Sequence, residues 1–206
     1  MDLPVGAFLE RLAAETPTPG GGSTAALAAA LAASLVSMVC RYTVGRERFR
    51  EVEGSISRVL AHADGLRDEL AQAVQRDIEA YGSYAHAAAL PRGTQEERRA
   101  RTKALQAALR ASTEVPLAVA ERSAAVLGLA LEAAALGNPN LISDAAVAAE
   151  LAEGARRAAA LNVRLNAHGI NDAAFVQACS ERLQAVEGRA SGLRERVMAT
   201  VMERSA

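Results

Sequence analysis

The sequence predicts an all-α protein, a single-domain antiparallel bundle of about seven helices. Apolar residues make up 50% of the 206 residues but aromatic residues only 3%, so the core is built mainly from Ala, Leu and Val. Alanine and leucine have the highest helix propensities, and small side chains let helices approach closely. A core so poor in aromatics buries little surface per helix, and we therefore expect a homodimer or larger oligomer.

Three helices are predicted in the first half of the chain. Residues 3–14 form a short amphipathic segment, followed by a loop of Pro and Gly. Residues 24–43 carry no charge before Arg41 and are rich in Ala and Ser, too polar for a membrane span, which indicates a buried central helix. In residues 49–90 apolar side chains recur every three to four positions until Pro91 ends the pattern.

Two helices are predicted between residues 94 and 136. Thr94 and Glu97 have the spacing of a capping box, which predicts a helix over 94–112. Pro116 suits the first turn of a helix, and we expect a new helix over 114–136.

Two further helices complete the predicted bundle. Ser143 as N-cap and Asp144 in the first turn start a helix over 143–168. A turn containing Gly169 precedes the last helix, over 173–203. The short connections favour antiparallel neighbours, and no boundary divides residues 1–206 into more than one domain.

Charge and cysteine usage narrow the class of protein. The formal net charge of −1 gives no overall attraction to nucleic acid. The N-terminus has an acid and no basic segment, unlike a signal peptide. Cys40 and Cys179 are isolated thiols, typical of small core residues in a reduced protein. We expect a cytoplasmic protein with no membrane or nucleic-acid partner, and the spacing of its three histidines predicts no metal site.

A loop of two prolines and three glycines precedes the central helix, from Thr16 to Thr24. Backbone amides at a helix N-terminus bind anions and polar ligands. No Lys follows Gly22 and no strand precedes the loop, so it is not a P-loop. Ser23 as an N-cap would explain part of the motif. Three consecutive glycines exceed what a cap needs, because glycine costs entropy on folding, and we expect close approach of a ligand or partner chain.

Three polar groups beyond the loop have informative spacing. Asp77, Tyr81 and Tyr84 lie at i, i+4 and i+7 on one helix face, where the carboxylate is either a proton-transfer group or a solvated residue at the edge of the core. Asn162 and Asn166 lie at i and i+4 on an otherwise apolar helix, and we expect them at an interface or in a groove. Asp144 lies about 27 Å from Asn162 along the axis.

Several motifs occur together in an order and spacing that identify one family. They are Pro17-Thr18-Pro19-Gly20-Gly21-Gly22-Ser23, Ser37-Met38-Val39, Thr43-Val44-Gly45-Arg46 with Phe49, Asp77-Ile78-Glu79-Ala80-Tyr81, Leu90-Pro91, Val115-Pro116-Leu117, Gly137-Asn138 with Ser143-Asp144-Ala145, and Asn162-Val163 with Asn166. With these motifs the chain resembles the cyclodeaminase/cyclohydrolase family of folate enzymes from Leu3 to about Met202. Details such as Ser37-Met38-Val39-Cys40 are most similar to its stand-alone cyclohydrolases.

The resemblance implies a single all-helical domain that forms a homodimer, with a folate site in a groove near the subunit interface. It implies hydrolysis of 5,10-methenyltetrahydrofolate to 10-formyltetrahydrofolate, with no metal or redox cofactor. Two alternatives remain open: release of ammonia from 5-formiminotetrahydrofolate, and folate binding by a helical protein without catalysis.

The resemblance also assigns roles to residues. Asp77 matches the catalytic position of the cyclodeaminase domain. The second acid that the family usually has one or two residues earlier is replaced by Gln75 and Arg76. The expected folate-binding residues are Pro19, Gly20, Gly21, Gly22, Ser23, Met38, Arg46, Arg48, Tyr81, Asn138 and Asp144. Arg46 and Arg48 follow the central helix, where cations suit the helix C-terminus or could hold the glutamate carboxylates of a folate.

Overall fold

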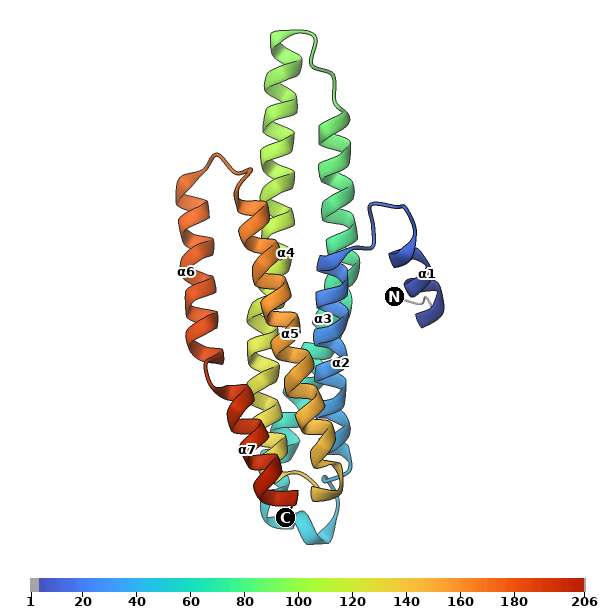
Figure 1. Cartoon of the computed structure of the whole chain (residues 1–206), viewed down its shortest axis with the longest axis vertical. Helices are drawn as coiled ribbons and strands as arrows, with labels where there is room; N and C mark the ends of the chain where they lie inside the picture. The colour runs from blue at the N-terminus through green and yellow to red at the C-terminus, as the bar shows by residue number, and fades with distance from the viewer. Residues whose placement is uncertain (1–3, 206) are drawn as a thin grey trace.

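The computed structural model describes residues 4–205, and every regular element in this range is a helix, as predicted (Figure 1). The helices are α1 (Val5–Ala13), α2 (Gly21–Arg41), α3 (Glu53–Ala89), α4 (Gln95–Leu136), α5 (Ile142–Ala167), α6 (Ala173–Ala190) and α7 (Leu193–Ser205), with the short 3-10 turns η1 (Glu47–Val52) and η2 (Pro139–Leu141). Helices α2 to α5 pack side by side as a bundle, and α6 and α7 pack on its outside against α4 and α5.

Helix α2 is the core helix that its composition predicts. It is long and apolar enough to cross a membrane by composition alone, but most of it is buried inside the bundle against α3, α4 and α5. Its buried side chains are small, among them Ala26, Ala29 and Ala33, so neighbouring backbones approach closely. Cys40 is also buried there, and burial raises the pKa of its thiol to about 12.

Helix α4 is continuous through Pro116, so the predicted break between residues 112 and 114 is wrong. Proline lacks the N–H that would bond to the carbonyl four residues earlier, which here belongs to Ser112. The side chain of Asn166 on α5 donates to that carbonyl instead, at 2.6 Å. A tertiary contact therefore replaces the missing hydrogen bond and lets the helix continue.

The predicted last helix, 173–203, is divided into α6 and α7. Gly192 has φ 71°, a left-handed conformation that redirects the chain at this point. Residue 3, where the first helix was expected to begin, lies outside the described residues, and α1 begins at Val5. The capping box of Thr94 and Glu97 is present at the start of α4 as predicted.

The two ends of the bundle differ. At one end α3 and α4 form a hairpin that projects beyond the other helices (Figure 1). At the opposite end, the turn after α4 is fixed to the end of α2. The backbone N–H of Asn138 donates to Thr43 Oγ1 at 2.9 Å, and its Nδ2 donates to the Tyr42 carbonyl at 3.3 Å.

Candidate active site

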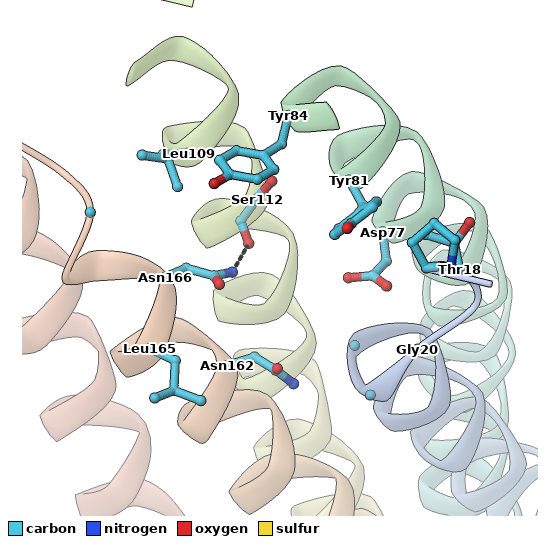
Figure 2. A pocket seen from close by; sticks show the side chains of 14 residues that line it. Thr18, Gly20, Asp77, Tyr81, Tyr84, Leu109, Ser112, Asn162, Leu165 and Asn166 are labelled. Carbon is cyan, nitrogen blue, oxygen red and sulfur yellow. Dashed lines mark hydrogen bonds between the residues drawn. The ribbon is translucent and has the colours of Figure 1, made fainter. Parts of the chain in front are cut away.

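Asp77 on α3 lies directly against the first turn of α2 (Figure 2). Ser23 Oγ donates a 2.7 Å hydrogen bond to Asp77 Oδ2. A Cβ atom at Gly22 would lie 2.1 Å from Asp77 Oδ1, a distance that atoms in contact do not reach. Glycine is therefore required at position 22, because the carboxylate occupies the space of a side chain.

The positive end of α2 faces this carboxylate. Helix α2 begins at Gly21, three residues before the predicted start, and its N-cap is Gly20 without a side-chain cap. Ser23, considered as an N-cap from the sequence, instead lies fully buried in the first turn. The first N–H groups of a helix have no intrahelical partner and carry partial positive charge, so an ionised Asp77 is well placed here.

A cavity of about 500 Å³ opens beside Asp77, within the size range of small-molecule sites. Tyr81 and Tyr84 continue the Asp77 face of α3, as predicted, with ring centroids 6.2 Å apart. Asp77 is the one charged side chain among the lining residues. They are Pro17, Thr18, Gly20, Gly21, Gly22, Asp77, Tyr81, Tyr84, Leu109, Ser112, Asn162, Leu165, Asn166 and Gly169.

The two asparagines of α5 lie across the cavity from Asp77 in the same protomer (Figure 2). Asn166 Nδ2 is engaged with the Ser112 carbonyl, and Asn162 Nδ2 donates to the carbonyl of Ala158 at 3.2 Å. Both side-chain amides are thus oriented by backbone groups. Their oxygens remain available to a ligand that donates hydrogen bonds.

Several lining residues were not predicted from the sequence. Leu109 and Ser112 come from α4, and Leu165 from α5, next to the predicted asparagines. Leu165 could have been predicted, because it lies three residues after Asn162 on the same helix face. Nothing in the sequence indicated that Leu109 and Ser112 line the cavity, because the predicted break at residue 112 separated them from the rest of their helix.

Another part of the predicted site lies elsewhere. Arg46, Arg48 and Asn138 line a second cavity of about 540 Å³ at the opposite end of α2. Met38 and Asp144 also belong to that end of the bundle. Helix α2 is about 30 Å long at 1.5 Å per residue, so one small ligand does not reach both cavities of a protomer. Pro19 is buried and does not line the first cavity.

Asp77 has no second acid beside it, as the sequence indicated. Gln75 Nε2 donates to Glu79 at 3.1 Å, and Arg76 Nη2 donates to the carbonyl of Glu69 at 2.9 Å. Both side chains are engaged along the exposed part of α3 and neither lines the cavity. The chemistry of the cavity therefore depends on a single carboxylate.

The fold and the cavity define an all-helical protein with a ligand-sized site that has one carboxylate, held against a helix N-terminus. The chain belongs to the formiminotransferase-cyclodeaminase family, whose sequence model matches residues 4–185. It is 44% identical over 197 residues to the methenyltetrahydrofolate cyclohydrolase of Methylorubrum extorquens, covering 94% of this chain and 93% of that protein.

Two further similarities support this family. The formimidoyltransferase-cyclodeaminase of Rattus norvegicus is 34% identical over 186 residues, which are 90% of this chain and 34% of that longer protein. The crystal structure of a formiminotetrahydrofolate cyclodeaminase from Thermotoga maritima superposes with a TM-score of 0.87 at 27% identity. The match covers 98% of this chain and 97% of that one.

Proposed function

We propose that the chain is a methenyltetrahydrofolate cyclohydrolase, which hydrolyses 5,10-methenyltetrahydrofolate to 10-formyltetrahydrofolate. The observation that carries this proposal is the lone negative charge of Asp77 in the cavity. The substrate's bridge is an amidinium cation, which a single carboxylate without a neighbouring cation attracts. The 44% identical cyclohydrolase, matched over nearly its whole length, supports the same choice.

The proposed mechanism needs one group that both takes and returns a proton. Water adds to the bridging carbon while Asp77 accepts a proton from it. The bond from this carbon to N5 then breaks, and N5 takes the proton back from Asp77. The hydroxyl of the adduct loses its proton to solvent as the formyl C=O forms on N10. One water is consumed and one proton is released.

The remaining lining groups have binding roles in this proposal. The N–H groups of Gly21 and Gly22 bind a polar edge of the substrate or the oxygen of the adduct, since the helix N-terminus supplies unpaired donors there. Tyr81 stacks against a flat part of the folate. The oxygens of Asn162 and Asn166 accept from its N–H groups.

We also propose that the protein is a homodimer in which α2 and α5 pack against a second copy. These neighbouring helices expose large apolar side chains, namely Leu31 (51% exposed), Val147 (49%), Leu161 (55%) and Leu165 (57%). Leu165 also lines the cavity, so a second copy on this surface would cover the cavity's edge. Sedimentation should give a dimer for the native chain, and Leu31→Arg should give a monomer; a native monomer contradicts this.

The proposed dimer would bring the second cavity of one protomer close to the first cavity of the other. In a two-fold pairing with antiparallel α2 helices, the start of one α2 lies beside the end of the other. A substrate in the first cavity would then be contacted by this end of the bundle only from the partner subunit. The residues concerned are Arg46, Arg48, Asn138, Met38 and Asp144. Within a protomer, Asn138 is already occupied, since its Oδ1 accepts from the N–H of Asn140 at 3.1 Å.

The function is tested by turnover of two substrates. The proposal predicts loss of the methenyl absorbance when 5,10-methenyltetrahydrofolate is added. A second candidate, supported by the Thermotoga maritima structure, is the cyclodeaminase reaction, which would release ammonia from 5-formiminotetrahydrofolate. Ammonia release from 5-formiminotetrahydrofolate without hydrolysis of 5,10-methenyltetrahydrofolate would show that the protein is a cyclodeaminase. Tight folate binding without either reaction indicates a binding protein and contradicts the proposal.

A further inference from the structure

Two arginines on the projecting hairpin are held by backbone carbonyls. Arg101 Nε and Nη2 both donate to the carbonyl of Ala88, at 3.2 and 3.1 Å, which joins α4 to α3. Arg98 Nη1 donates to the carbonyls of Arg92 at 3.2 Å and Gly93 at 2.7 Å. These bonds fix both guanidinium groups in place and leave other N–H groups of each unused.

The charges of these two arginines are not neutralised. Some arginines of the bundle pair with acids, as Arg182 does with Glu114 and Glu121, each at 2.9 Å. Within residues 4–205, no carboxylate lies within ion-pair distance of Arg98 or Arg101. Two positioned cations without counter-charges are suited to an anionic group from outside the chain.

On α4, Arg101 precedes the cavity-lining residue Ser112 by eleven positions and therefore shares its helix face. On α3, Asp77, Tyr81, Tyr84 and Ala88 recur at i, i+4, i+7 and i+11 and therefore share one face. The guanidinium of Arg101 is bonded to the last of these, Ala88. Eleven residues of helix separate Ala88 from Asp77, which is about 16 Å along the axis.

Residues of the hairpin line the surface between Asp77 and the guanidinium group of Arg101. Tyr84 and Leu109, from α3 and α4, lie at the hairpin end of the cavity (Figure 2). On α4, Leu109 is followed at helical spacing by Leu105 and Arg101, both half-buried. An aromatic and apolar surface thus leads from the carboxylate of Asp77 to the cations.

We propose that Arg101, assisted by Arg98, binds the glutamate carboxylates of the folate substrate within the same protomer. This inference rests on the proposed function. With the bridging carbon at Asp77, the aminobenzoyl ring lies along Tyr84 and Leu109, and the glutamate that follows it reaches the guanidinium groups. Arg46 and Arg48, at the opposite end of α2, would reach that glutamate only from a partner subunit.

The test compares a substrate with and without its glutamate. Arg101→Gln keeps a donor for the Ala88 carbonyl and removes the charge. We expect it to raise KM for 5,10-methenyltetrahydrofolate about tenfold, the effect of one lost charge-assisted hydrogen bond. KM for 5,10-methenyltetrahydropteroate, which lacks glutamate, should stay unchanged and shows that the variant is folded. Arg98→Gln should have a smaller effect of the same kind.

Arg99→Gln is the matched control for Arg101→Gln, since Arg99 is exposed and lies about 160° from Arg101 around the same helix. It should change neither KM. The inference is overturned if Arg101→Gln leaves the ratio of the two KM values as in the native protein. It is also overturned if only the double variant Arg46→Gln and Arg48→Gln changes that ratio, because the glutamate then binds at the other end.

The proposed function can fail separately. If the native protein turns over neither substrate, the same comparison is made by calorimetric titration with tetrahydrofolate and tetrahydropteroate. If the native protein binds tetrahydrofolate more tightly than tetrahydropteroate and Arg101→Gln removes this difference, Arg101 binds the glutamate carboxylates even though the protein is not a catalyst. Equal affinity for both ligands overturns it.

Discussion

Ser23 Oγ on α2 donates a 2.7 Å hydrogen bond to Asp77 Oδ2 on α3, between residues 54 positions apart in the chain. Ser23 is fully buried, and its helix is the core of the bundle. Asp77 is therefore oriented by a buried residue of the core helix.

Replacing Gly22 should inactivate the protein without unfolding it. In Gly22→Ala the new methyl group occupies the place of the Asp77 carboxylate, which must move by more than an ångström. A displacement of this size costs about 100-fold in rate, and we expect that loss in kcat/KM. Circular dichroism checks the fold. Gly128→Ala is the control, because no atom lies within 4 Å of its new methyl group, and it should keep full activity.

Removing the Ser23 hydroxyl should lower kcat more than it raises KM. In Ser23→Ala the carboxylate keeps its charge but loses the donor that orients it, and we expect kcat to fall about tenfold. Ser34→Ala is the matched control on α2, since Ser34 Oγ donates only to the carbonyl of Ala30 in its own helix, at 2.8 Å. Equal kinetics of the two variants would show that Ser23 does not position Asp77.

Acid should weaken the bundle partly through Asp64. Its carboxylate accepts from Arg41 on α2 at 2.7 Å and from Arg67 at 3.0 Å. Burial alone would raise the pKa of Asp64, but the hydrogen bond and charge of Arg41, with the charge of Arg67, lower it below the ordinary 3.8. Its stabilisation is therefore fully present above about pH 4 and is lost as pH falls through the lowered pKa.

Urea unfolding of Asp64→Asn measures this contribution. At pH 7 the variant should lose about 1 kcal/mol or less of the free energy of unfolding, because the pair is partly exposed. The difference from the native protein should shrink below pH 3. A difference that is the same at both pH values contradicts the assignment.

The helical class and the buried α2 could be predicted because composition and periodicity are local properties of the sequence. The continuity of α4 could not. It depends on Asn166, 50 positions after Pro116, whose side chain supplies the hydrogen bond that proline lacks. Similarly, the break at Gly192 depends on a φ angle that a helical pattern does not reveal.

The candidate site was predicted in its parts but not in its arrangement. Asp77, Tyr81 and the glycine loop do meet, yet Gly22 is glycine because Asp77 fills its side-chain space, a close approach within the chain that the sequence could not specify. Arg46 and Arg48 follow α2 in the sequence, and the length of that helix carries them to the other end of the bundle. The order of motifs along the sequence does not reveal how far apart they lie in the folded protein.

The most direct test of the central claim is the rate of methenyl hydrolysis by Asp77→Asn. Asparagine has the same shape but neither the charge nor the proton-accepting oxygen of the carboxylate. With the fold verified by circular dichroism, we predict that kcat falls by about 100-fold or more, the contribution of general acid–base catalysis. Near-native loss of the methenyl absorbance by the folded variant would contradict the role of Asp77.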